Sequence, residues 1–170
     1  DGRKETFQEL VQKGLGGFLV RNMESYGILD TMGLTSRIVL DANIYTMNNR
    51  AEAFWMKKGI LGDTVPLELN AKELVHRNNK NSELTVYGYT PMMVSVQCVQ
   101  KTMDHCNHAC VQYVLKDRYQ KEFRGVCSCE FCYNTIYNTL PTSLLKEKEK
   151  AEKLGIRIVN EEEFLGMIGE

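Results

Sequence analysis

The feature that most limits how this chain can fold is a strand–helix alternation along its first half. Short apolar stretches suited to strands begin near residues 17, 37, 63 and 83, about 20 to 26 residues apart, which is the spacing of βα units. Stretches suited to helices alternate with them, at about 3–13, 23–32, 46–58 and 71–77. Apolar strands separated by helical crossovers are typical of a parallel sheet. The sequence therefore predicts an α/β fold.

The length of the chain decides between complete and partial versions of that fold. Four βα units are half of a (βα)₈ barrel, which needs about 250 residues when complete, whereas this chain has 170. We therefore expect a partial TIM-like (βα) barrel or a small parallel sheet within residues 1–145. Residues 90–139 break the rhythm and are predicted to be an irregular cysteine-rich insert with one helix near 108–120. A charged helix and a short βα tail are predicted for 146–170, too short for an independent domain.

Composition narrows the functional classes. The net charge is −1, with 21 Lys and Arg against 22 Asp and Glu, so no overall basic field points to nucleic acid. The sequence has no apolar run near the roughly 18 residues that a membrane helix needs, and its start has no apolar signal-peptide core. We therefore expect a cytoplasmic protein without a membrane partner.

All six cysteines lie between residues 98 and 132. Without a secretion signal, clustered cysteines more often bind metal than form disulfides. Cys129 and Cys132 form a CxxC pair, and Cys98 and Cys106 supply a second pair, of which Cys106 lies 23 residues before Cys129. Such a four-cysteine set can hold zinc or an iron–sulfur cluster, and the spacing alone slightly favours zinc. The alternative is a group of buried, unliganded thiols.

Two further cysteines are left over by this pairing. Cys110 and Cys127 are spare, although Cys127 stands two residues before Cys129 and could replace it as a ligand.

Polar side chains follow several of the predicted strands, where barrel enzymes place their catalytic groups. They are Arg21, Asn22, Asp41, Asn43, Glu68 and Asn70. Together they could line a polar pocket above the sheet. The alternative is that they cap helices and satisfy loop backbone.

Aromatic and basic side chains mix along residues 113–124. They could bind an RNA strand by stacking and phosphate contacts. The alternative, which we favour, is an amphipathic helix with its aromatic side chains in the core. No GxSxG, HExxH or P-loop motif is present.

Several stretches resemble the peptidase U32 family of collagenase-like proteins, over about residues 17–145. They are GFLVRNMES (17–25), LDANIYTMNNRAEAFW (40–55), PLELNAKEL (66–74), ELTVYGYTPMMVSVQC (83–98), LKDRYQKEF (115–123) and CEFCYNTIYN (129–138). The family's cysteine pattern falls on Cys98, Cys106, Cys129 and Cys132. Where the family often has a His-Gly pair, this chain has Tyr87 and Gly88.

The resemblance implies a TIM-like barrel and a [4Fe–4S] cluster held by those four cysteines. It also implies an enzyme that supports hydroxylation of an RNA base or a small aromatic substrate, with an electron or oxygen donor that the residues do not identify. Glu68, Asn70 and Arg21 would act as catalytic residues that orient the substrate, and Asn22, Asp41, Asn43 and Tyr87 would line the substrate pocket. One alternative is a non-catalytic binding module with a structural Zn–Cys₄ site. Another is a peptide hydrolase, as the family name suggests.

The end of the chain resembles a different family. Residues 148–170 are similar to the last strand and helix of a BRCT domain, as found at the end of bacterial NAD-dependent DNA ligases. The resemblance implies an interaction role for a full BRCT domain, but this stretch is far shorter than one.

Overall fold

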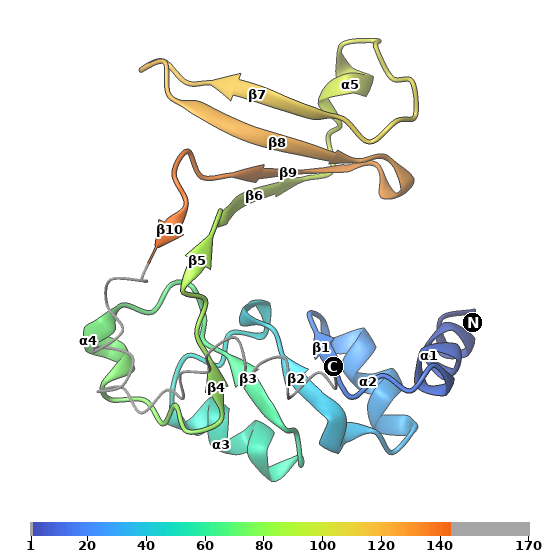
Figure 1. Cartoon of the computed structure of the whole chain (residues 1–170), viewed down its shortest axis with the longest axis vertical. Coiled ribbons are helices and arrows are strands. Elements are labelled where there is room, and N and C mark those ends of the chain that lie inside the picture. Colours follow the sequence, from blue (N-terminus) through green and yellow to red (C-terminus); the bar gives the residue numbers. More distant parts are fainter. Residues whose placement is uncertain (1, 144–170) are drawn as a thin grey trace. The chain divides into compact units, whose positions relative to one another are not determined.

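The computed structural model of the chain describes residues 2–143 (Figure 1). They form a mixed α/β structure with two compact units, one up to Thr85 and one from Val86 onward. Within residues 2–143 no helix has the length and apolarity to cross a membrane. The predicted elements of the tail, 146–170, lie outside the described residues.

The first unit contains the predicted strand–helix alternation, and the structure confirms its helices to within a few residues. Its elements in chain order are α1 (Gly2–Gln12), β1 (Phe18–Val20), α2 (Met23–Thr31), η1 (Thr35–Arg37), β2 (Ile38–Leu40), η2 (Ala42–Ile44), α3 (Asn49–Lys57), β3 (Gly62–Thr64), α4 (Ala71–Leu74) and β4 (Ser82–Glu83).

The four strands of this unit form a parallel sheet in the order β1-β2-β3-β4. In its register Val20 pairs with Leu40, and Leu40 pairs with Asp63. Sequential order with parallel pairing is the arrangement that repeated βα units produce. The prediction of a parallel sheet is therefore confirmed.

The core of the first unit lies between this sheet and its helices. Val20, Ile38 and Leu40 from β1 and β2 are almost completely buried. Tyr26 of α2 packs edge-on against Trp55 of α3, with ring centroids 4.8 Å apart. In β2 the half-buried Val39 stands between the buried Ile38 and Leu40, and in β1 Leu19 is 56% exposed, so one face of these strands is buried more completely than the other.

The second unit is an antiparallel structure. Its elements are β5 (Tyr87–Gly88), β6 (Pro91–Ser95), α5 (Val99–Thr102), β7 (Gln112–Lys116), β8 (Glu122–Ser128), η3 (Cys129–Phe131), β9 (Tyr133–Tyr137) and β10 (Thr142–Ser143). Four of the strands form a sheet in the order β6-β9-β8-β7, and β5 pairs with β10. Helix α5 and the loop after it lie at the end of the sheet where β6 ends and β7 begins (Figure 1).

The predicted helix near 108–120 is wrong, because residues 112–128 form the hairpin of β7 and β8. Side chains along β7 alternate between exposed and half-buried, which is the period of a strand. The turn is closed by Asp117, whose carboxylate accepts hydrogen bonds from the N–H groups of Tyr119 at 2.8 Å and Lys121 at 2.9 Å. The cysteine region is therefore built around a regular antiparallel sheet instead of being irregular throughout.

The strand predicted to begin near residue 83 is also divided in the structure. Ser82–Glu83 is the last strand of the parallel sheet, while Tyr87–Gly88 pairs with β10 in the second unit. One apolar run in the sequence thus supplies two short strands on either side of the boundary at Val86.

Candidate metal centre

Three cysteine side chains converge in the second unit. The Sγ atom of Cys127 lies 3.5 Å from that of Cys98 and 3.4 Å from that of Cys129. Cys98 and Cys127 are buried and Cys129 is half-buried. All six cysteines are free thiols, so the disulfide framework weighed against metal binding is not formed.

Separate segments bring these three thiols together. Cys98 follows β6 and precedes α5, and its carbonyl accepts a hydrogen bond from the N–H of Thr102 at 3.0 Å. Cys127 lies near the end of β8, directly opposite Asn134 of β9. Cys129 begins the short η3 turn. The cluster is thus built by the end of the antiparallel sheet and the first turn of α5.

The surroundings of the two buried thiols affect their acidity in opposite directions. The pKa of Cys98 is lowered, chiefly by the backbone N–H of Lys101, although burial acts against this. The pKa of Cys127 is raised to about 12, first by its contact with Cys129 and then by burial. Backbone N–H donors stabilise a thiolate, and it is Cys98 that faces them. In the metal-free protein Cys98 is therefore the more acidic of the pair.

The other cysteines lie on exposed segments beside this cluster. Cys106 and Cys110 belong to the loop between α5 and β7, and Cys132 takes a left-handed conformation with φ of 53°. The loop contacts the cluster at its end, because the Cys129 thiol donates to the Ala109 carbonyl at 2.7 Å. The structure thus brings together Cys98 and Cys129 of the predicted set, with Cys127 between them.

The cysteine thiols are suitable metal ligands by their chemistry, but the four predicted ligands are not gathered around one point. Among residues 2–143, no group of three or more His, Cys, Asp or Glu side chains is arranged so that it could hold a metal ion. Soft sulfur donors select zinc or iron–sulfur clusters over hard cations. Cys98 and Cys129 supply donors of this chemistry and both contact Cys127, whereas Cys106 and Cys132 are exposed.

The residues predicted to line a pocket above the parallel sheet make mostly local contacts. Asn22 and Asn70 cap α2 and α4, and Asp41 caps η2. Asn43 and Glu68 are exposed. These contacts match the helix-capping alternative.

Two other residues of that set also have clear positions. The Arg21 guanidinium lies 3.5 Å from the Asp41 carboxylate, with its side chain 64% exposed. This ion pair joins the carboxyl ends of β1 and β2. Tyr87 is 58% exposed and belongs to the second unit, in β5.

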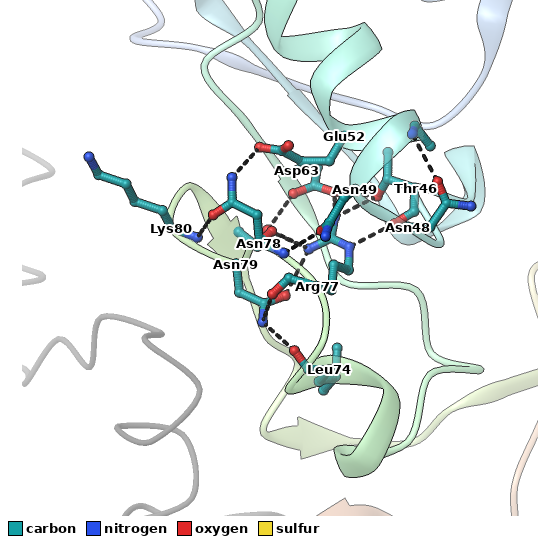
Figure 2. Close-up of polar contacts among 12 residues, drawn as sticks. Thr46, Asn48, Asn49, Glu52, Asp63, Leu74, Arg77, Asn78, Asn79 and Lys80 are labelled. Atoms are coloured by element: carbon teal, nitrogen blue, oxygen red, sulfur yellow. Dashed lines mark hydrogen bonds and ion pairs between the residues drawn. The ribbon is translucent and has the colours of Figure 1, made fainter.

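The first unit also contains a buried polar network that the sequence does not predict (Figure 2). Arg77 is only 6% exposed and Asp63 only 3%, and the two form an ion pair. Arg77 also donates to the Thr46 carbonyl at 2.8 Å and to the Ser82 hydroxyl at 2.8 Å. Through Arg77 the network links the loop before α3 with the strands β3 and β4. No sequence pattern points to it, because Asp63 stands between a glycine and a threonine in the short strand β3.

Comparisons of the chain with protein-family models, with curated proteins and with solved structures gave no match. The U32 resemblance therefore rests on the residues that carry it.

Proposed function

We propose that this chain is a U32-type iron–sulfur protein that supports hydroxylation of an RNA base or a small aromatic substrate. The observation that carries the proposal is the convergence of Cys98 and Cys129 on a common neighbour, the Cys127 thiol, at 3.5 and 3.4 Å. The two residues come from different segments and both belong to the family's cysteine set. Such convergence is what a shared metal group requires.

In this proposal the thiolates of Cys98, Cys106, Cys129 and Cys132 hold a [4Fe–4S] cluster. When bound, the cluster would supply electron transfer or activation of an oxygen donor. The proposal requires the loop that carries Cys106 to move toward Cys129. Another residue of that loop, Ala109, contacts Cys129 already through its carbonyl. Binding energy of the metal group can drive such an ordering, because metal binding and folding are coupled.

The parallel sheet would be part of a TIM-like barrel, with the substrate bound at the carboxyl ends of its strands. Arg21, Glu68 and Asn70 would orient the substrate. The Arg21–Asp41 pair at the ends of β1 and β2 supports this, since an exposed guanidinium there can contact an incoming polar group.

The test is metal analysis of protein purified without oxygen. We expect a brown protein that absorbs near 400 nm, with about four irons per chain. Cys98→Ser and Cys129→Ser should each lose the iron, whereas Cys110→Ser, an exposed cysteine outside the family set, should keep it. A colourless protein without iron would overturn the proposal.

A second candidate is a binding module with a structural zinc site, and the sulfur spacing favours it. Four thiolates at about 2.3 Å from one zinc lie about 3.7 Å from each other, close to the 3.4 and 3.5 Å observed around Cys127. In that case Cys127 would itself be a ligand. Cys127→Ser separates the candidates: it should abolish zinc binding in the second and leave the iron in place in the first.

A further inference from the structure

The Cys127 thiol is the common neighbour of two other thiols. Its Sγ atom lies 3.5 Å from the Cys98 Sγ atom and 3.4 Å from the Cys129 Sγ atom, and all three are free thiols. A disulfide has an S–S length of about 2.05 Å, so either pair has to close by only about 1.4 Å to form one. Cys127 can therefore form a disulfide with either neighbour, but with only one of them at a time.

Hydrogen bonds hold the chain on both sides of the contact between Cys98 and Cys127. The N–H of Cys127 donates to the Val111 carbonyl at 2.9 Å, and Cys127 pairs with Asn134 in the register of β8 and β9. The Nδ2 atom of Asn134 donates in turn to the Gln97 carbonyl at 3.1 Å, directly before Cys98. The folded sheet itself therefore brings these two sulfurs together.

The three thiols differ in their access to solvent. Cys98 is 6% exposed and Cys127 is 0% exposed, whereas Cys129 is half-buried. A reagent in solution therefore meets Cys129 first. The rate of thiol–disulfide exchange depends on access to the sulfur that is attacked, so a disulfide between the two buried sulfurs is the one that a reductant reaches least.

We propose that these three cysteines form a thiol–disulfide relay, driven by a hydroperoxide, that ends in a disulfide between Cys98 and Cys127. In the first step the Cys129 sulfur attacks the hydroperoxide and its O–O bond breaks. Cys129 becomes a sulfenic acid, and the leaving oxygen takes up the thiol proton. The Cys127 sulfur then attacks the Cys129 sulfur, so that an S–S bond forms, the S–O bond breaks and water leaves with the Cys127 proton.

The last step transfers the disulfide to the buried pair. The Cys98 sulfur attacks the Cys127 sulfur, the bond from Cys127 to Cys129 breaks, and Cys129 leaves with the proton of Cys98. Overall, two thiols lose two electrons and two protons, and hydrogen peroxide is reduced to two waters. The relay needs only the thiol contacts and does not rest on the iron–sulfur proposal, although a Cys98 in a disulfide cannot also bind a metal.

The experiment uses the full chain, reduced in the presence of a chelator to six free thiols and then treated with an equimolar amount of hydrogen peroxide. We expect the loss of two thiols per chain. Peptide mapping by mass spectrometry should find Cys98 joined to Cys127, with Cys129 free. An end product that joins other cysteines, such as Cys129 with Cys132, overturns the proposal, and so does a chain that keeps all its thiols.

Variants test the order of the steps. Cys129→Ser removes the entry point and should slow the formation of the buried disulfide at least about 10-fold. Cys98→Ser should stop the relay at a disulfide between Cys127 and Cys129. The matched control, Cys110→Ser, removes an exposed cysteine and should be oxidised like the unaltered chain. Equal rates for the Cys129 and Cys110 variants overturn the proposal. Peptide mapping of the unaltered chain decides the end product even if a variant fails to fold.

Discussion

The two units of this chain treat their buried polar groups differently. In the first unit the buried charges of Arg77 and Asp63 are paired with each other and with Thr46 and Ser82. In the second unit the buried Asn134 Oδ1 and Tyr113 hydroxyl have no partner among the described residues. A fully satisfied network rigidifies a fold, whereas unsatisfied groups are expected at functional sites. The Tyr26 hydroxyl of the first unit is also without a partner among the described residues, so the units differ mainly in charge: the buried charged side chains described, Glu52, Asp63 and Arg77, all belong to the first unit.

The units also differ in how much apolar surface they bury. The first has a continuous core that includes Leu29, Ile38 and Leu40, each 0% exposed. In the second, the buried apolar side chains are Cys98, Cys127 and Ile136, while Val94 is 65% exposed and Val96 is 87% exposed. Small domains with little core are commonly stabilised by metal sites. A metal group bound at the cysteines, as proposed above, would add to the stability of this unit.

The largest predicted effect distinguishes the thiols of the second unit. With its pKa raised from an ordinary 9.0 to about 12, Cys127 is protonated at pH 8. Only the thiolate reacts with iodoacetamide, and each pKa unit changes its population about tenfold. In metal-free protein, Cys127 should therefore react about 1,000-fold more slowly than an ordinary thiol. Peptide mapping by mass spectrometry measures the rates.

Cys98 is the internal control for that measurement. It is buried like Cys127, at 6% against 0% exposure, but its pKa is lowered, so it should react before Cys127. The rate at Cys127 should continue to rise as the pH approaches 12. Equal rates at the two buried cysteines would contradict the arrangement of contacts described for this cluster.

The next effect tests the buried ion pair of the first unit. Arg77→Met leaves the Asp63 carboxylate buried without its partner, which costs about 3–5 kcal/mol. Trp55 is the single tryptophan and lies in the core of this unit, so its fluorescence during urea unfolding measures the loss there. The control Arg21→Met breaks an exposed pair and should cost less than about 1 kcal/mol. Equal losses would show that the network does not stabilise the unit.

Much of the first unit could be predicted from sequence because its signals are local. Buried strands such as Ile38–Leu40 are continuous apolar runs, and Asn22 and Asn70 are residues that cap helices. The network around Arg77 could not be predicted, because its members come from Thr46, Asp63 and Ser82, which are distant in sequence. Each is an ordinary polar residue until the fold brings it to the others.

The second unit was harder to predict for a physical reason. Its β7 strand, QYVLK, places half-buried Tyr113 and Leu115 between exposed neighbours, a pattern of only five residues that a short helix can also present. The turn after it, closed by Asp117, was the missed signal of a hairpin. Spacing predicts Cys98 and Cys129 as ligands and leaves Cys127 spare or as a substitute for Cys129, whereas the fold places the Cys127 thiol in contact with both.

A glycine in the second unit provides the third test. In Gly125→Ala the new methyl group would collide with the Tyr113 ring. Overpacking of this kind costs about 1–3 kcal/mol. Hydrogen exchange of β7, β8 and β9 amides should accelerate accordingly, while β1 and β2 stay unchanged. A variant with unaltered exchange in β8 would show that the tyrosine ring is free to move aside.

The smallest effect comes from the corresponding substitution in the first unit, and it should have the opposite sign. Gly27 lies inside α2, and a Cβ atom there would meet no other atom within 4 Å. Because glycine loses more backbone entropy on folding than alanine, Gly27→Ala should stabilise this unit by about 0.5–1 kcal/mol. Trp55 fluorescence in urea measures the shift, since Trp55 packs against Tyr26 of the same helix. Destabilisation by this variant would contradict the open space described around Gly27. The pair of glycine variants thus compares an open helix face with a closely packed sheet face by the same methyl group.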